Sequence, residues 1–181
     1  MHGKRTVTID AATEMSVKIR KERTEDVNAI YRVVEEAFDS KLEAELVSLI
    51  RSREQSLLSF VATLGGQVIG HVLVSPITIT SSSRGNFGGI APLSVCPAHQ
   101  GKGIGSALMF AAIEECRKLG LAALFSLGHP EYYPRFGFTV SHLGNEYGAT
   151  DTFMQLEFVP ACLKSVRGKA MYVPAFGEIG T

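Results

Sequence analysis

Residues 100–106 read Gln100-Gly101-Lys102-Gly103-Ile104-Gly105-Ser106, a glycine-rich turn between a predicted strand and a predicted helix. Glycine has no side chain, so the backbone N–H groups of such a turn can approach an anion closely. The N-terminus of the helix that follows adds a positive partial charge. We therefore predict that this turn binds a phosphate or a pyrophosphate group.

Two familiar nucleotide-binding motifs do not fit this turn. The Walker loop requires Ser or Thr directly after its Gly-Lys pair, whereas Lys102 is followed by Gly103. The dinucleotide fingerprint requires a third glycine, where Ser106 stands, and an acidic residue near the end of the next strand. That strand ends in Leu127-Gly128-His129. The pattern that fits is Gln-x-x-Gly-x-Gly, which follows Pro97 and a strand that ends in Leu93-Ser94-Val95.

The segments around the turn alternate between strand and helix. Apolar residues at helical spacing predict a helix from about Ile104 to Leu119, and Gly120 ends it. Pro130 then opens a short helical turn. Apolar runs predict strands at Ile90–Val95, Leu121–Leu127 and Phe153–Val159.

The first half of the chain shows the same mixture of periodicities. Thr24, followed by acidic residues, predicts a capped helix start, and Gly65-Gly66 suits a tight hairpin. The expected elements are a strand at Ser16–Arg20, helices at 24–38 and Leu42–Ile50, strands at Leu57–Leu64 and Val68–Thr80, and a loop at Ser81–Gly89. This order predicts an α/β fold with a mixed sheet and helices on its faces.

Length and charge limit the classes of function. The 181 residues suit one domain, which we expect at 16–181 after a loosely ordered extension at 1–15 with a weak strand at Thr6–Ile9. Eighteen basic residues balance eighteen acidic residues, so the net charge does not favour binding to nucleic acid or to an anionic membrane. We expect neither as a partner.

The cysteines and the N-terminus indicate where the protein works. Three widely separated cysteines, at positions 96, 116 and 162, form neither a disulfide framework nor a zinc motif. The first fifteen residues lack the apolar stretch of an export signal. We therefore expect a cytoplasmic protein without a metal site.

A second motif lies about thirty residues after the glycine-rich turn. Tyr133-Pro134-Arg135-Phe136-Gly137-Phe138 has the form Tyr-x-x-x-Gly-Phe. The turn, its helix and this element together resemble the GNAT family of acetyl-CoA-dependent N-acyltransferases. The run from Leu127 to Phe138 is similar to the YhbS-type predicted acetyltransferases of bacteria. The resemblance covers roughly residues 16–160.

The resemblance implies a fold and a coenzyme. The fold is a GNAT-like mixed, mostly antiparallel sheet with a splayed central strand pair and helices on both faces. The cosubstrate is acetyl-CoA. Its pantetheine arm pairs with the backbone of Leu93, Ser94 and Val95, and the neighbouring strand at Leu121–Leu127 splays away to admit the thioester. The pyrophosphate lies on backbone amides at Gly101, Lys102, Gly103, Ile104, Gly105 and Ser106, behind Gln100.

The resemblance also implies an acid for the reaction. The family places a tyrosine where Tyr133 stands, against the coenzyme sulfur, and we expect it to protonate the leaving thiolate. Its alternative role is that of a core aromatic beside Phe136 and Phe138. Tyr132 is expected to pack. Cys96 is expected to be a small buried residue, because an acyl-cysteine intermediate requires an activated thiol.

The general base stays open. A free alkylamine is mostly protonated at neutral pH, so some group must accept its proton. The candidates are Glu43, Glu45, Glu131, His71 and His129, and for each of them the sequence favours a solvated surface residue over a base. His129 stands out a little, because it lies at the end of the splayed strand.

The predicted function is direct transfer of an acetyl group from acetyl-CoA to a primary amine, with a backbone N–H near Val95 stabilising the oxyanion. The acceptor is a small metabolite, an antibiotic-like amine, a peptide N-terminus or a protein lysine. A homodimer is left open. The alternatives are an acyl-CoA-binding sensor of the same fold, without turnover, and an enzyme for a longer or acidic acyl-CoA.

Overall fold

The computed structural model describes residues 16–179, and for 82–84 it describes the backbone alone. The extension predicted at 1–15, with its strand at Thr6–Ile9, lies outside the described residues, and the division of the chain there stays a prediction. The helices are α1 (Val27–Phe38), α2 (Leu42–Ser52), α3 (Ile104–Lys118) and α4 (Ala175–Glu178), with short 3-10 turns at Thr24–Asp26, Pro97–His99 and Tyr133–Phe136.

The strands form one mixed, mostly antiparallel sheet. They are β1 (Lys18–Lys21), β2 (Leu58–Leu64), β3 (Gln67–Ile79), β4 (Ser82–Val95), β5 (Ala123–Leu127), β6 (Thr139–Val140), β7 (Gly144–Asn145), β8 (Phe153–Glu157) and β9 (Lys169–Met171). The main order is β1-β2-β3-β4-β5-β8-β6, and β9 pairs with both β3 and β7. Along the main order, β4 and β5 are parallel and the other neighbours are antiparallel. This confirms the predicted fold class.

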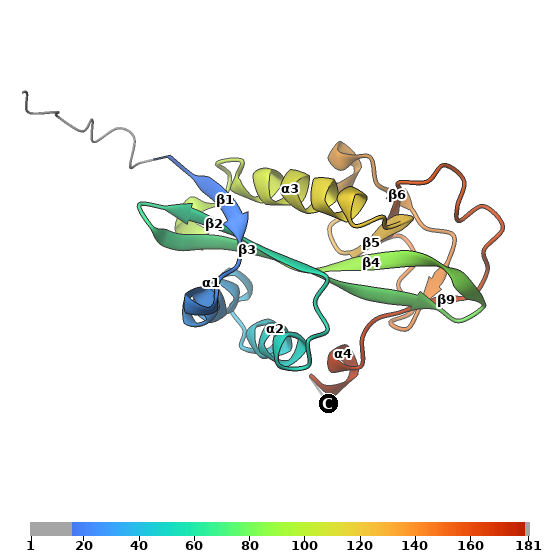
Figure 1. Ribbon diagram of the computed structural model, residues 1–181, viewed down its shortest axis with the longest axis horizontal. Helices are drawn as coiled ribbons and strands as arrows, with labels where there is room; N and C mark the ends of the chain where they lie inside the picture. Colours follow the sequence, from blue (N-terminus) through green and yellow to red (C-terminus); the bar gives the residue numbers. More distant parts are fainter. Residues whose placement is uncertain (1–15, 180–181) are drawn as a thin grey trace, which may run out of the picture.

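Helices cover both faces of the sheet (Figure 1). The apolar face of α3 packs on one side, with Leu108 and Met109 against Val72 and Leu124. The other side carries α1, α2 and α4, whose Ile30, Val47 and Ala175 share a core with Val61 and Leu73. The alternation of side chains along a strand explains why neighbouring residues of β2 and β3 serve opposite cores.

The central strand pair opens at one end. Strands β4 and β5 pair from Phe87–Ala123 to Ile90–Ser126, and within the described residues the pairing stops there. At the same point β4 bulges, since Ile90 lies opposite Val74 and Leu93 opposite Val72. Two residues, Ala91 and Pro92, therefore face one residue of β3, and a bulge of this kind bends its strand. The predicted splay is thus present.

The loop expected at Ser81–Gly89 is wrong, because this segment is the first part of β4. It forms an antiparallel hairpin with β3, in which Phe87 pairs with Ile77 and Gly88 with Pro76. Two of the glycines that indicated a loop, Gly88 and Gly89, are packing residues. A Cβ atom on Gly88 would lie 2.9 Å from the side chain of Val74, and one on Gly89 would lie 2.9 Å from that of Ile77. Close packing, and not turn geometry, explains them.

Candidate functional site

The glycine-rich turn connects the end of β4 to the start of α3. Gly101 and Gly103 have φ angles of +72° and +79°, which a side chain disfavours. The amide of Gln100 donates from Nε2 to the Val95 carbonyl oxygen at 3.0 Å. This bond fixes the turn against β4. The first backbone N–H groups of α3 have no acceptor within the helix and point out of its N-terminus.

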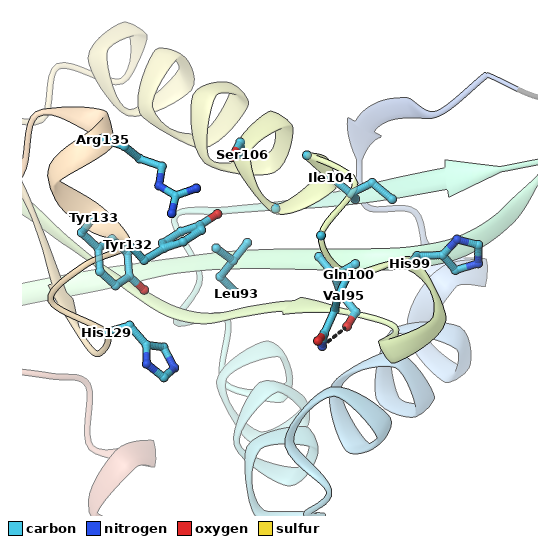
Figure 2. Close-up of a pocket in the computed structure, with 13 residues that line it drawn as sticks. Leu93, Val95, His99, Gln100, Ile104, Ser106, His129, Tyr132, Tyr133 and Arg135 are labelled. Carbon is cyan, nitrogen blue, oxygen red and sulfur yellow. Dashed lines mark hydrogen bonds between the residues drawn. The ribbon is translucent and has the colours of Figure 1, made fainter.

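A cleft of about 430 Å³ opens beside this turn (Figure 2). Its lining includes Leu93, Val95, Gln100, Gly101, Gly103, Ile104, Gly105, Ser106 and Tyr133, all of which the sequence analysis nominated. A Cβ atom on Gly101 or Gly103 would meet nothing within 4 Å. The glycines of the turn therefore border open space, and a phosphate can reach their backbone.

Two nominated residues lie outside the lining. The side chain of Ser94 is 3% exposed and points into the sheet, where its hydroxyl donates to the His71 carbonyl oxygen. The ammonium of Lys102 donates to the Ala98 carbonyl oxygen at 2.8 Å. Neither side chain faces the cleft, so each can serve a ligand there through its backbone alone.

The two adjacent tyrosines both line the cleft but point in different directions (Figure 2). Tyr133 is 8% exposed, and its ring lies edge-on to that of Tyr132 at 5.4 Å between centroids. The Tyr132 hydroxyl lies over the start of α3, 2.9 Å from the position of a Cβ atom on Gly105. Burial raises the pKa of both phenols. Both hydroxyls therefore hold their protons at neutral pH and can act as donors.

Arg135 and His99 also line this cleft and were not predicted from the sequence. The guanidinium of Arg135 lies 4.5 Å from the centre of the Tyr132 ring, an attractive cation–π arrangement. Arg135 follows Tyr132 by three residues, so one helical turn brings the two together. That spacing was the available signal. The cation adds positive charge to a cleft suited to an anion.

The structure separates the candidates for the general base. His129 lines the cleft just described. His71 is fully buried under the sheet, where its Nε2 lies 2.8 Å from the Ser59 hydroxyl. Glu45 and Glu131 are exposed and line neither this cleft nor the one described next. Glu43 belongs to that second cleft.

The second cleft, of about 290 Å³, opens on the α2 side of the sheet. It is lined by Leu42, Glu43, Leu46, Ala91, Leu127, Tyr147, Tyr172, Phe176 and Ile179. Ala91 and Leu127 are the first residues beyond the last β4–β5 pair, Ile90–Ser126. The first cleft contains Leu93 and His129, two residues farther along each chain segment. Both clefts therefore lie at the same splay.

Cys96 is not an activated nucleophile. Its thiol donates to Glu36 Oε2 at 3.3 Å. Burial, together with the Glu36 carboxylate, raises the pKa of the thiol to about 11. The thiolate is the nucleophilic form of cysteine, so this thiol is unreactive at neutral pH. Within residues 16–179, no group of three or more His, Cys, Asp and Glu side chains is placed to hold a metal ion.

The chain is similar in sequence to a known protein family and to two curated bacterial proteins. Residues 24–138 match the Acetyltransferase (GNAT) family. The uncharacterized N-acetyltransferase YjhQ of Escherichia coli K12 is 37% identical over 116 residues, which are 62% of this chain and 64% of YjhQ. The uncharacterized N-acetyltransferase YhbS of the same strain is 35% identical over 124 residues, 68% of this chain and 74% of YhbS. The match thus spans less than two thirds of YjhQ.

Solved structures resemble the whole described fold. The crystal structure of YhbS from Escherichia coli in complex with CoA superposes with a TM-score of 0.85 at 28% identity, covering 98% of this chain and 96% of the other. A GNAT family acetyltransferase from Brucella melitensis in complex with acetyl-CoA gives a TM-score of 0.77 at 35% identity, covering 90% and 99%. The arrangement of strands around the splay is therefore shared with coenzyme-bound relatives.

Proposed function

This chain belongs to the acetyltransferase (GNAT) family, and from that premise we propose that it transfers an acetyl group from acetyl-CoA to a primary amine. One observation carries the proposal: the glycine-rich turn at the start of α3 borders an open cleft of about 430 Å³ at the splay of β4 and β5. Solved relatives of the same fold hold CoA or acetyl-CoA.

The residues of the cleft fit such a coenzyme. Gly101 and Gly103 leave room for phosphate oxygens at the backbone, and the first N–H groups of α3 supply donors with a favourable dipole. Arg135 adds a cation to the lining. The backbone of Leu93, Ser94 and Val95 supplies the edge of β4 that faces the gap left by β5, where an extended pantetheine arm would pair.

The chemistry proceeds by direct transfer. The lone pair of the neutral amine attacks the thioester carbonyl carbon, and a backbone N–H near Val95 stabilises the oxyanion. The carbon–sulfur bond then breaks, and Tyr133 donates its proton to the departing thiolate. Because burial raises the pKa of Tyr133, the phenol is protonated when this proton is required. Glu43 and His129, which line the two clefts, are the candidates for accepting the amine proton.

We also propose that the protein works in the cytoplasm, as a partner of neither nucleic acid nor membrane. Its three cysteines are free thiols, as a reducing compartment favours. Within residues 16–179, no helix is long and apolar enough to cross a membrane.

The function is tested by two measurements on the whole chain. The first is thiol release from acetyl-CoA in the presence of a panel of primary amines. The second is thermal unfolding with acetyl-CoA at ~100 times its dissociation constant, where binding adds about 2.7 kcal/mol. For this chain length we expect a rise of roughly 5–11 °C in the melting temperature.

The outcomes distinguish the possible roles. Stabilisation together with amine-dependent thiol release supports the enzyme. Stabilisation without release from any amine supports an acyl-CoA sensor. An equal shift with NAD, whose fingerprint the turn lacks, contradicts the assignment of the coenzyme.

A further inference from the structure

The second cleft lies where an acceptor would have to approach. Ala91 of β4 and Leu127 of β5 form its floor at the splay. The remaining lining comes from α2, from the segments after β7 and β9, and from α4. Figure 1 shows α2 and α4 on the face of the sheet opposite α3. A molecule bound here would meet the thioester from the side away from the glycine-rich turn.

The wall of this cleft is aromatic. The Tyr172 ring lies 5.8 Å from the Tyr147 ring and 4.7 Å from the Phe176 ring, centroid to centroid. Gly89 makes room for this wall, because a Cβ atom there would lie 2.9 Å from the Tyr172 ring. Leu42 and Leu46 of α2 contribute further apolar surface to the lining. The cleft therefore offers an apolar surface against which an apolar group can pack.

The aromatic wall is held in place by hydrogen bonds to polar side chains. The backbone N–H of Tyr147 donates to Asn145 Oδ1 at 3.0 Å, and Asn145 is 3% exposed. The backbone N–H of Tyr172 donates to Glu146 Oε1 at 2.7 Å. The two tyrosines belong to segments that β7 and β9 pair side by side. These hydrogen bonds and the strand pairing fix the positions of the two tyrosines.

Two polar atoms of the lining residues are buried and have no hydrogen-bond partner among the described residues: Glu43 Oε2 and Tyr172 Oη. Buried polar atoms are nearly always paired in folded proteins, so each of these two atoms lacks a partner that a bound ligand could supply. Glu43 supplies the one carboxylate of the described lining, which holds no Lys, Arg or His. The electrostatic preference of the cleft is for a single positive charge.

Burial raises the pKa of Tyr172, and the neighbouring Tyr147, Tyr133 and Glu146 raise it further. The Tyr172 phenol therefore keeps its proton at neutral pH and can donate a hydrogen bond to a ligand in the second cleft.

We propose that the second cleft binds the acceptor, and that it selects a small primary amine with one positive charge and an aromatic or branched apolar group. The ammonium lies toward Glu43, and the apolar group lies against Tyr147, Tyr172 and Phe176. This inference rests on the acetyl transfer proposed above and names its substrate class. Aromatic faces attract cations as well as apolar groups, so the wall serves both ends of such a molecule.

Other classes of acceptor fit less well. A polyamine or an aminoglycoside carries several positive charges, of which the lining would neutralise one. An amino acid would bring its carboxylate next to Glu43 without a cation in the described lining to pair it, and like charges placed side by side repel. The volume of about 290 Å³ suits a small molecule better than a folded partner.

The experiment compares three probes in the thiol-release assay: 2-phenylethylamine, phenylalanine and spermidine. Phenylalanine differs from 2-phenylethylamine by its carboxylate alone. We expect kcat/KM for 2-phenylethylamine to exceed that for either other probe by at least about tenfold. A higher value for phenylalanine or spermidine overturns the inference, while release from either still supports the proposed function.

Variants of the lining add a second criterion. Glu43→Gln and Phe176→Ala should each lower kcat/KM for 2-phenylethylamine by about tenfold. Both should leave the affinity for acetyl-CoA, measured by calorimetry, within about twofold of the parent. Glu45→Gln is the matched control, because Glu45 lies on the same helix, is exposed and is outside the cleft. Equal losses from Glu43→Gln and Glu45→Gln overturn the inference.

Direct binding covers the case in which no probe is acetylated. 2-Phenylethylamine is then titrated into the CoA-loaded protein by calorimetry. Binding that Glu43→Gln weakens by about tenfold supports the cleft as its site, and no binding overturns the inference. If acetyl-CoA itself does not bind, the proposed function fails, and the inference fails with it.

Discussion

At the scale of single residues, Tyr133 combines burial with a position in the first cleft. Replacement by Phe keeps the ring against Tyr132 and Phe138 and removes the hydroxyl. A coenzyme thiol resembles cysteine, with a pKa of about 8.5, so its thiolate leaves without much help. We expect turnover to fall by about 10²-fold, with unchanged affinity for acetyl-CoA, in thiol-release and calorimetric measurements.

Tyr132→Phe is the matched control for this substitution. The Tyr132 hydroxyl lies over Gly105, at the start of α3, so its removal should affect coenzyme binding more than turnover. Parental turnover in Tyr133→Phe with a crippled Tyr132→Phe would show that the acid is Tyr132. If neither substitution changes turnover, no tyrosine acts as the acid.

At the scale of elements, the junction of β4 and α3 depends on the backbone conformation of Gly103. Its φ angle is +79°, and a Cβ atom there would meet open space. Gly103→Val should therefore destabilise the unliganded protein by about 1–2 kcal/mol through backbone strain. The added side chain occupies the space proposed for the phosphates, so we expect the dissociation constant for acetyl-CoA to rise by at least about tenfold.

Gly148→Val separates strain from lost binding. Gly148 has a φ angle of +68°, also meets nothing within 4 Å, and lies outside both clefts. The Gly148→Val protein should be destabilised as much as the Gly103→Val protein. In calorimetric titration it should bind acetyl-CoA with the affinity of the parent. Parental affinity in a folded Gly103→Val protein would place the phosphates elsewhere.

At the scale of the whole molecule, a buried polar network joins the end of β1 to α2, β2 and β3. Arg51 Nε donates to Glu22 Oε1 at 2.6 Å, and the Ser59 hydroxyl donates to Glu22 Oε2 and lies 2.8 Å from His71 Nε2. Burial alone would raise the pKa of Glu22, but the nearby His71 and the hydrogen bonds from Arg51 and Ser59 lower it to about 2. Burial lowers the pKa of His71, against the opposing effect of Glu22.

Both shifts destabilise the fold in acid. Each group has a lower pKa in the folded chain than in the unfolded chain, so the unfolded chain binds more protons as the pH falls. The loss of stability should begin near the ordinary pKa of histidine, about 6.5, and steepen between about 4.5 and 2 as Glu22 is protonated. Melting temperatures from pH 7.5 to pH 3 measure it.

Glu22→Gln isolates the contribution of the Glu22 carboxylate to the pH dependence of stability. This variant should be less stable than the parent at pH 7. The difference in stability should narrow below pH 4.5, where Glu22 binds a proton in the unfolded parent but still carries its charge in the folded one. A gap that stays constant down to pH 3 contradicts the role given to Glu22.

The amino-acid sequence by itself determined the parts of the protein that depend on local geometry. The glycine-rich turn at 100–106, the helix behind it and the Tyr133 element are short-range patterns, in which residue type sets backbone dihedrals and spacing sets helix faces. These parts predicted the fold class, and they nominated most of the lining of the first cleft. Residue spacing cannot show where a strand side chain faces after a bulge, so the inward direction of Ser94 was not predictable.

The tertiary structure alone decided the features made by distant segments. Gly88 and Gly89 read locally as loop residues, yet they lie in β4 because Val74, Ile77 and Tyr172 pack against their backbone. The second cleft joins α2 to α4 and Tyr172, more than 120 residues later in the chain. Such contacts are selected by the burial of apolar surface between whole elements. No periodicity within a single segment encodes which distant partner will cover it.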